Sequence, residues 1–135
     1  MRRPGAEAIR VTGLKAGKYE VRVGGKKIAE LTADQLATGA NLASGALADG
    51  AIAEQVKAVR AAVENKNRFH HDAIFRGIVL SNVPDWVNDI VPREQLEAKK
   101  KTIIQERLAK LPELDTAVAQ TLVMKANTFD IVPVQ

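Results

Sequence analysis

The segment His70-His71-Asp72 holds both histidines of the chain and is the clearest candidate for chemistry. Imidazole binds metals and transfers protons near neutral pH, and a neighbouring carboxylate can orient it. Adjacent residues on a helix point about 100° apart, so His70 and His71 do not converge on one metal ion. A helical zinc pair needs histidines four residues apart, as in His-Glu-x-x-His, and that pattern is absent. The sequence therefore predicts no metal site and favours a polar seam or an interface histidine.

A serine near these histidines would complete a hydrolase-like set. The chain has Ser44 and Ser81, and neither stands in a Gly-x-Ser-x-Gly pattern or follows a strand that leads into a helix. We therefore nominate no catalytic residue. If the chain is a hydrolase, its candidate residues are His70, His71, Asp72 and Ser81.

The glycines and the lack of cysteine exclude several other kinds of site. The nine glycines form no Walker or Rossmann loop, so no cofactor is predicted. The absence of cysteine excludes disulfides, zinc–thiolate sites and thiol nucleophiles.

A helix that begins near Gly50 is expected to position the histidines. Its apolar residues are spaced four, three and four apart, which places them on one narrow stripe: Ile52, Val56, Val59 and Val63. The same step of about 100° places Asn67, His70 and Ile74 on the extension of this stripe. Because the apolar face turns polar in the middle of the helix, we expect Asn67 and His70 to belong to a ligand site or an interface.

Residues 9–31 have the alternation of a β-meander. Apolar residues alternate with polar ones from Ile9 and again over residues 19–23. Gly24-Gly25 suits a tight hairpin, because both central residues of a type I′ turn need positive φ. Residues 26–31 complete the pattern, and we expect a three-stranded antiparallel meander.

Helices are expected to follow over residues 32–126. Thr32 and Gln35 form a capping-box pattern that begins a short helix, which Gly39 ends. The remaining pieces are a small-residue linker (41–50), the histidine helix, a loop or single turn (85–91) and two helices (93–110 and 113–125). Residues 127–135 are expected to be an extended tail, in which Pro133 allows only an edge strand. The sequence thus predicts one α+β module of residues 1–135, a meander followed by a bundle of three to four helices.

Length and charge limit the partners of the chain. A chain of 135 residues fits one domain. The net charge is +4, but the basic residues are interleaved with 16 acidic ones, whereas a nucleic-acid binder gathers basic charge on one face. No apolar stretch approaches the roughly 20 residues of a membrane span, and no apolar region follows Met1-Arg2-Arg3-Pro4. We expect a soluble chain with no secretory signal and no nucleic-acid or membrane partner, and no compartment is predicted.

Several stretches of the first half resemble a known protein family. They are residues 13–21, 31–36 and 39–43, with a further match over residues 65–70. This pattern is similar to the segment that follows the catalytic domain in bacterial SGNH (GDSL-like) hydrolases. In that family the helix commonly carries an Asn, a His and an aromatic-Arg pair. Asn67 and His70 match the first two, and Phe75-Arg76 would stand for the pair.

The resemblance implies an accessory role without catalysis. The family carries its nucleophile in a Gly-Asp-Ser block and its base in an Asp-x-x-His block, and neither block occurs in these residues. The chain would then be an accessory or interaction module whose partner is a catalytic SGNH-type domain, with Asn67 and His70 facing that domain. Two alternatives stay open. One is a small ester hydrolase acting around His70 and His71, and the other is a helical self-association module, because its apolar stripes exceed what one small core buries.

Overall fold

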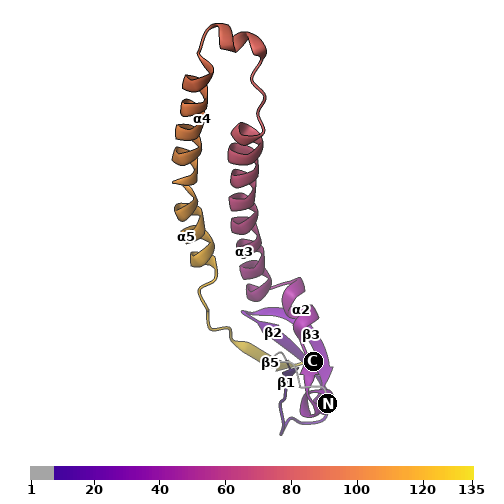
Figure 1. Cartoon of the computed structure of the whole chain (residues 1–135). Helices are drawn as coiled ribbons and strands as arrows, with labels where there is room; N and C mark the ends of the chain where they lie inside the picture. The colour runs from indigo at the N-terminus through magenta and orange to yellow at the C-terminus, as the bar shows by residue number, and fades with distance from the viewer. Residues whose placement is uncertain (1–7) are drawn as a thin grey trace, which may run out of the picture. The chain divides into compact units, whose positions relative to one another are not determined.

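The computed structural model describes residues 8–135, so the Met1-Arg2-Arg3-Pro4 segment, for which no secretory signal is expected, lies outside the described residues. The chain divides into two compact units, Met1–Ala58 with Met124–Gln135 and Val59–Val123. The first unit holds the strands, and the second is helical (Figure 1). The expected α+β class is confirmed.

Strand β2 (Lys18–Val23) is the centre of a three-stranded antiparallel sheet. Strand β3 (Lys26–Thr32) pairs with one of its edges and β5 (Phe129–Pro133) with the other. The φ angles of Gly24 and Gly25 are 56° and 82°, which confirms the tight hairpin between β2 and β3. The side chains on the inner face of β2 are buried, in agreement with their alternation in the sequence.

The three-stranded sheet is confirmed, but the first strand of the predicted meander is not part of it. Strand β1 (Ala8–Ile9) pairs instead with β4 (Ala40–Asn41) in a separate two-stranded sheet. The extended run ends early because Gly13 and Gly17 have φ angles of 82° and 153°.

Strand β5 pairs with the edge of β2 at which the meander prediction placed the strand that begins at Ile9. It pairs Ile131 with Val21 and Pro133 with Tyr19. Pro133 is tolerated because β5 has no further strand on its outer side in the described sheet, so its missing N–H removes no ladder bond there. The tail predicted for residues 127–135 is therefore extended and forms the expected edge strand.

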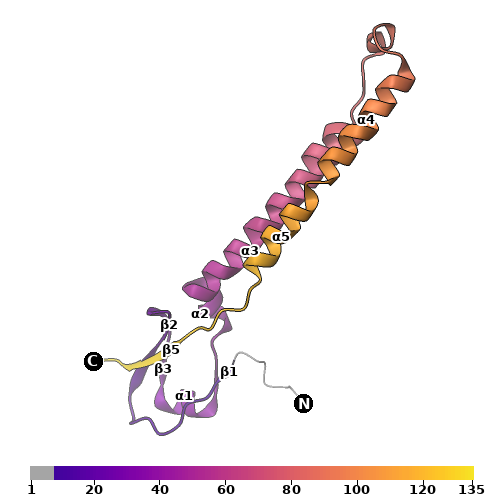
Figure 2. The same cartoon turned by 90° about the vertical axis from the view of Figure 1, so that its left-hand side faces the viewer.

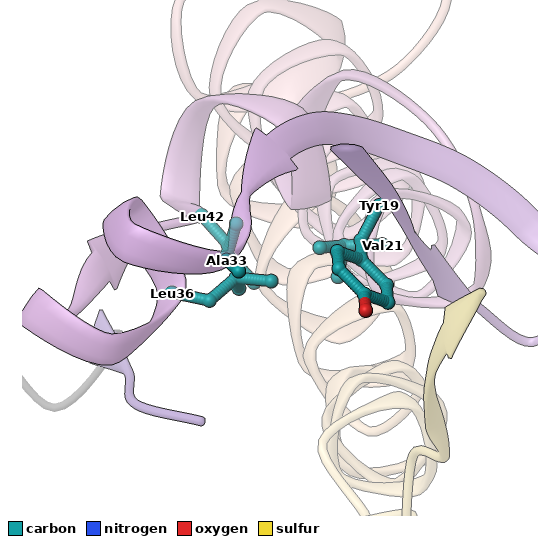
Figure 3. Close-up of a cluster of buried hydrophobic side chains, with 5 residues drawn as sticks. All are labelled: Tyr19, Val21, Ala33, Leu36 and Leu42. Atoms are coloured by element: carbon teal, nitrogen blue, oxygen red, sulfur yellow. The ribbon is translucent and has the colours of Figure 1, made fainter. Parts of the chain in front are cut away.

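Helix α1 (Ala33–Thr38) covers the core of the first unit. Its capping box is confirmed, because the Gln35 N–H donates to Thr32 Oγ1 at 3.2 Å and the Thr32 N–H donates to Gln35 Oε1 at 2.9 Å. The core side chains come from β2, from α1 and from the turn before the next helix (Figure 3): Tyr19, Val21, Ala33, Leu36 and Leu42.

The expected linker over residues 41–50 contains a helix, α2 (Ala43–Ala48). Its small residues let it lie close against β3. A Cβ added to Gly45 would overlap the carbonyl oxygen of Ile28. Ala46, one residue later, is buried. Gly45 and Ala46, which resemble parts of a linker in the sequence, are therefore packing residues.

Helix α3 (Ala51–Arg68) begins in the first unit and continues in the second, where it leads into the π-helix η1 (Phe69–Val79). A 3₁₀ turn, η2 (Asp85–Asp89), precedes α4 (Arg93–Leu108) and α5 (Leu111–Thr121). The last two helices confirm the predictions for residues 93–110 and 113–125 to within a few residues. Within residues 59–123 the two helical stretches run side by side (Figures 1 and 2).

Polar and apolar contacts join the two stretches. The Lys66 ammonium pairs with the Asp115 carboxylate, and the Arg107 guanidinium donates to the Ala73 carbonyl. Ile74 and Ile78 are the buried hydrophobic residues of this unit. Within residues 8–135, the helices lack the length and apolar content that crossing a bilayer requires.

Candidate functional site

The candidate residues named from the sequence gather in one segment. Asn67 lies in the last turn of α3, and His70, His71, Asp72, Phe75 and Arg76 lie in η1. A π-helix of 11 residues is unusual, because such turns mostly occur as single bulges inside α-helices, often at functional sites. This change of helical type was not foreseen from the sequence.

One face of η1 is held by α4. Ile74 and Ile78 are 4% and 7% exposed, and Arg107 donates to the carbonyl of Ala73, the residue before Ile74. Gly77 lets this contact form, because a Cβ there would meet the Asp72 carbonyl oxygen at 2.5 Å and the Arg107 guanidinium at 3.3 Å. The segment is thus fixed from one side, whereas His70, His71 and Arg76 are exposed.

His71 and Asp72 form an exposed pair. His71 Nδ1 lies 2.8 Å from Asp72 Oδ1, and both side chains are more than half exposed. The His71 ring also lies 6.2 Å from the Phe75 ring at 40°. A carboxylate on Nδ1 fixes the orientation of an imidazole and leaves Nε2 free for proton transfer. Because the pair is open to solvent, its electrostatic coupling is strongly screened.

The sequence predicts that Asn67, His70 and Ile74 share one face of this helix, and that prediction is wrong for Ile74. Asn67 and His70 are exposed, whereas Ile74 is buried. The prediction used a constant step of about 100° per residue. A π-helix turns through a smaller angle per residue, so Ile74 reaches the face that packs on α4.

Arg76 lies beside Asp72 and Gly77, and the three residues line a shallow depression. Asn67 and His70 do not contribute to it. The geometry therefore brings Arg76 near Asp72 but does not form one pocket from Asn67, His70 and Arg76.

The serines of the hydrolase hypothesis have other surroundings. The Ser81 hydroxyl donates to the Ile78 carbonyl at 2.7 Å, where it satisfies an acceptor at the end of η1. Ser44 is exposed on α2, in the first unit. Among residues 8–135 no group of three or more His, Asp or Glu residues is arranged to hold a metal ion.

Sequence reasoning missed an apolar pocket in the first unit. It has a volume of about 250 Å³ and lies where β1, α2, the first turn of α3 and β5 meet. Its lining is Ala8, Ile9, Leu42, Ala43, Ala46, Leu47, Ile52 and Phe129. No sequence signal could have identified it, because three segments distant in sequence each contribute one or a few ordinary apolar residues. Because its lining residues are all apolar, the pocket is suited to binding an apolar group.

It also missed three exposed side chains in the connection between η1 and α4. Leu80, Trp86 and Ile90 are 58%, 61% and 69% exposed. We call residues 80–92 the connecting loop. It contains Asp85 and Asp89 but no lysine or arginine, although the whole chain carries a net charge of +4.

Comparison of the chain with known protein families, with curated proteins and with solved structures finds no match. The resemblance to the SGNH hydrolase segment therefore stays a prediction from the sequence.

Proposed function

We propose that this chain is a non-catalytic interaction module whose partner is a catalytic domain of the SGNH hydrolase type. Two observations support the proposal. Residues 13–21, 31–36, 39–43 and 65–70 resemble the segment that follows such a domain in bacterial SGNH hydrolases, and the Gly-Asp-Ser and Asp-x-x-His blocks of that domain are absent from the chain.

The connecting loop carries the proposal. Trp86 is 61% exposed, whereas tryptophan is buried on average and is enriched among the residues that dominate binding energies at interfaces. Leu80 and Ile90 add further exposed apolar surface on the same loop. Asp85 and Asp89 would favour a partner surface that places lysine or arginine around an apolar pocket. We therefore propose the connecting loop as the part that docks.

Calorimetry tests the proposal directly. A purified SGNH catalytic domain that contains the Gly-Asp-Ser and Asp-x-x-His blocks would be titrated with the full chain. We expect saturable binding, and we expect Trp86→Ser to weaken it by about tenfold or more, since loss of a buried aromatic anchor costs about 2 kcal/mol or more.

The matched control for Trp86→Ser is Leu47→Ser. Leu47 is another large, exposed apolar residue, 56% exposed, but it lies on α2. Its replacement should leave the binding unchanged. No measurable heat with the catalytic domain, or equal loss in both variants, would contradict the proposal.

The His71–Asp72 pair is the observation that favours the alternative of a small ester hydrolase. An assay of ester hydrolysis by the chain alone separates the two functions. Under the interaction proposal, the wild-type chain and its His70→Ala and His71→Ala variants hydrolyse no faster than buffer. Activity that disappears in His71→Ala would favour the hydrolase.

A further inference from the structure

Two neighbouring rows of exposed side chains run along α3 and η1 within the helical unit. The first row takes every fourth residue and contains Val63, Asn67, His71, Phe75 and Val79; we call it the apolar row after its two valines and its phenylalanine. The charged row also takes every fourth residue and alternates in sign: Arg60, Glu64, Arg68, Asp72 and Arg76. All ten residues are exposed.

The π-helix keeps these rows straight. In an α-helix, residue i+4 lies about 40° beyond residue i, so a row of fourth residues winds around the helix. A π-helix has more than four residues per turn, so the same row winds in the opposite direction. Because α3 passes into η1 at Phe69, the drift up to Asn67 is reversed from His71 onward. The five side chains of the apolar row therefore stay on one face.

This face lacks a covering layer in the described structure. The helical unit buries Ile74 and Ile78, whereas Val63, Phe75 and Val79 remain 37%, 44% and 47% exposed. Two helices side by side form one layer, and stable domains are built from at least two packed layers. A further pair of helices over the apolar row would complete a four-helix arrangement.

We propose that a second copy of this chain covers the apolar row, with the two copies antiparallel about a two-fold axis near His71. In this register Val63 of each copy faces Val79 of the other. Glu64 then lies opposite Arg76, and Arg68 lies opposite Asp72. The same surface meets itself, as a two-fold dimer requires.

The alternating charges of the charged row favour this antiparallel pairing over the same pairing shifted along the helix. Moving the antiparallel partner by one step of four residues would place Glu64 opposite Asp72 and Arg68 opposite its own copy. This shifted arrangement brings like charges together, which disfavours it. In a parallel pair with its two-fold axis along the helices, the two charged rows would lie on opposite sides of the seam, so neither would pair with the other.

The ion pairs within one chain leave Arg68 and Arg76 free to pair with the second copy. Glu64 pairs with Arg60 at 2.8 Å, and Asp72 pairs with His71 at 2.8 Å. Arg68 and Arg76 form no ion pair with any residue among 8–135. The second copy would supply a carboxylate to each of these two arginines.

The contact is short, so the dimer should be weak. We expect a buried area at or below the low end of the roughly 1,200–2,000 Å² of stable complexes, with a dissociation constant on the order of micromolar.

Sedimentation equilibrium of the full chain from about 0.1 µM to about 100 µM, which brackets that constant, measures the dimer directly. We expect Arg76→Glu and Glu64→Arg each to raise the dissociation constant about tenfold or more, because each places like charges opposite one another. The double variant Glu64→Arg/Arg76→Glu exchanges the two charges and should return the constant to within about threefold of the wild-type value.

Lys101→Glu is the control, since it makes the same change of charge as Arg76→Glu at an exposed position on α4. It should leave the dimer unchanged. Phe75→Ser tests the apolar row independently and should also weaken the dimer. Helix content measured by circular dichroism shows that each variant is folded.

Three results would overturn this proposal. They are a monomeric mass at every concentration, a dimer that neither charge reversal weakens, and a double variant that does not recover. None of them bears on the hydrolase-domain proposal, whose test is Trp86→Ser in the connecting loop.

Discussion

Glu20 holds two cations on the outer face of β2. Its carboxylate accepts hydrogen bonds from Arg22 at 2.7 and 3.0 Å and lies 3.3 Å from Lys27 Nζ. The hydrogen bond from Arg22, followed by that from Lys27, lowers the pKa of Glu20. Lys27 also bonds Glu30 and lowers the pKa of that carboxyl. The group links β2 to β3 by charge on the side of the sheet opposite the core.

We expect Glu20→Gln to lower the midpoint temperature of unfolding at pH 7, and the difference from wild type to disappear near pH 2. The folded-state pKa lies below the ordinary value of 4.5, so the ionised carboxylate stabilises the fold above that pH. This stability is lost as the pH falls through the lowered pKa. The effect should be small, because the partner side chains are 41% and 46% exposed.

Thermal unfolding followed by circular dichroism at several pH values measures this effect. Glu97→Gln, at an exposed position on α4, is the control and should behave as wild type at every pH. A Glu20→Gln difference of the same size at pH 2 and pH 7 would show that the carboxylate charge does not stabilise the sheet.

At the scale of elements, the close contact of α2 with β3 depends on the absence of a Cβ at Gly45. In an ordinary helix, Gly→Ala stabilises by about 1 kcal/mol. At Gly45 the new Cβ would overlap the carbonyl oxygen of Ile28, which belongs to backbone held in the sheet. Overpacking of this kind costs about 1–3 kcal/mol.

We therefore expect Gly45→Ala to lower the free energy of unfolding by up to about 2 kcal/mol, because the steric cost exceeds the gain in helix propensity. Urea unfolding measures it. Ser44→Ala, one residue earlier on the same helix and exposed, should change stability by less than about 0.5 kcal/mol. Stabilisation by Gly45→Ala would show that α2 can move away from β3 at little cost.

Elements defined by local signals were predictable from the sequence. The capping box of Thr32 and Gln35, the Gly24-Gly25 hairpin and the helices after Pro92 and around Pro112 depend on neighbouring residues. The partner of β2 was not predictable in this way. Ile9 and Ile131 both have the required alternation, and the choice between them depends on contacts distant in sequence.

The candidate site was predictable as a segment but not as a geometry. The sequence placed Asn67, His70 and Arg76 in one helical stretch, and they lie there. It could not show which face they take, because that depends on the change from α-helix to π-helix at Phe69. The exposure of Trp86 was also not foreseen, since tryptophan is buried on average.

At the scale of the whole molecule, β5 closes the sheet of the first unit from the far end of the sequence. It pairs with β2 from Phe129 to Pro133, and the Val134 N–H donates to the Lys18 carbonyl at 3.0 Å. Without β5 the backbone groups on that edge of β2 would be open to water or to another chain.

We expect truncation after Thr128, which removes β5, to increase amide hydrogen exchange in residues 18–23 and to promote aggregation, because β2 would then be an edge strand. Hydrogen exchange read by mass spectrometry and light scattering measure the two effects. Truncation after Val134, which removes only Gln135, is the control. Unchanged exchange in residues 18–23 after loss of β5 would show that the hairpin of β2 and β3 suffices.

The pairing of Val21 with Ile131 also sets an order of events during folding. The β2–β3 hairpin and the helices of residues 59–123 form from contacts close in sequence, which are fast. The β2–β5 pairing must wait until the whole helical unit has been synthesised, and it closes a long loop at an entropic cost. During this interval the nascent chain carries a formed hairpin with one open edge. During that interval the open edge is accessible to a chaperone or to a second nascent chain.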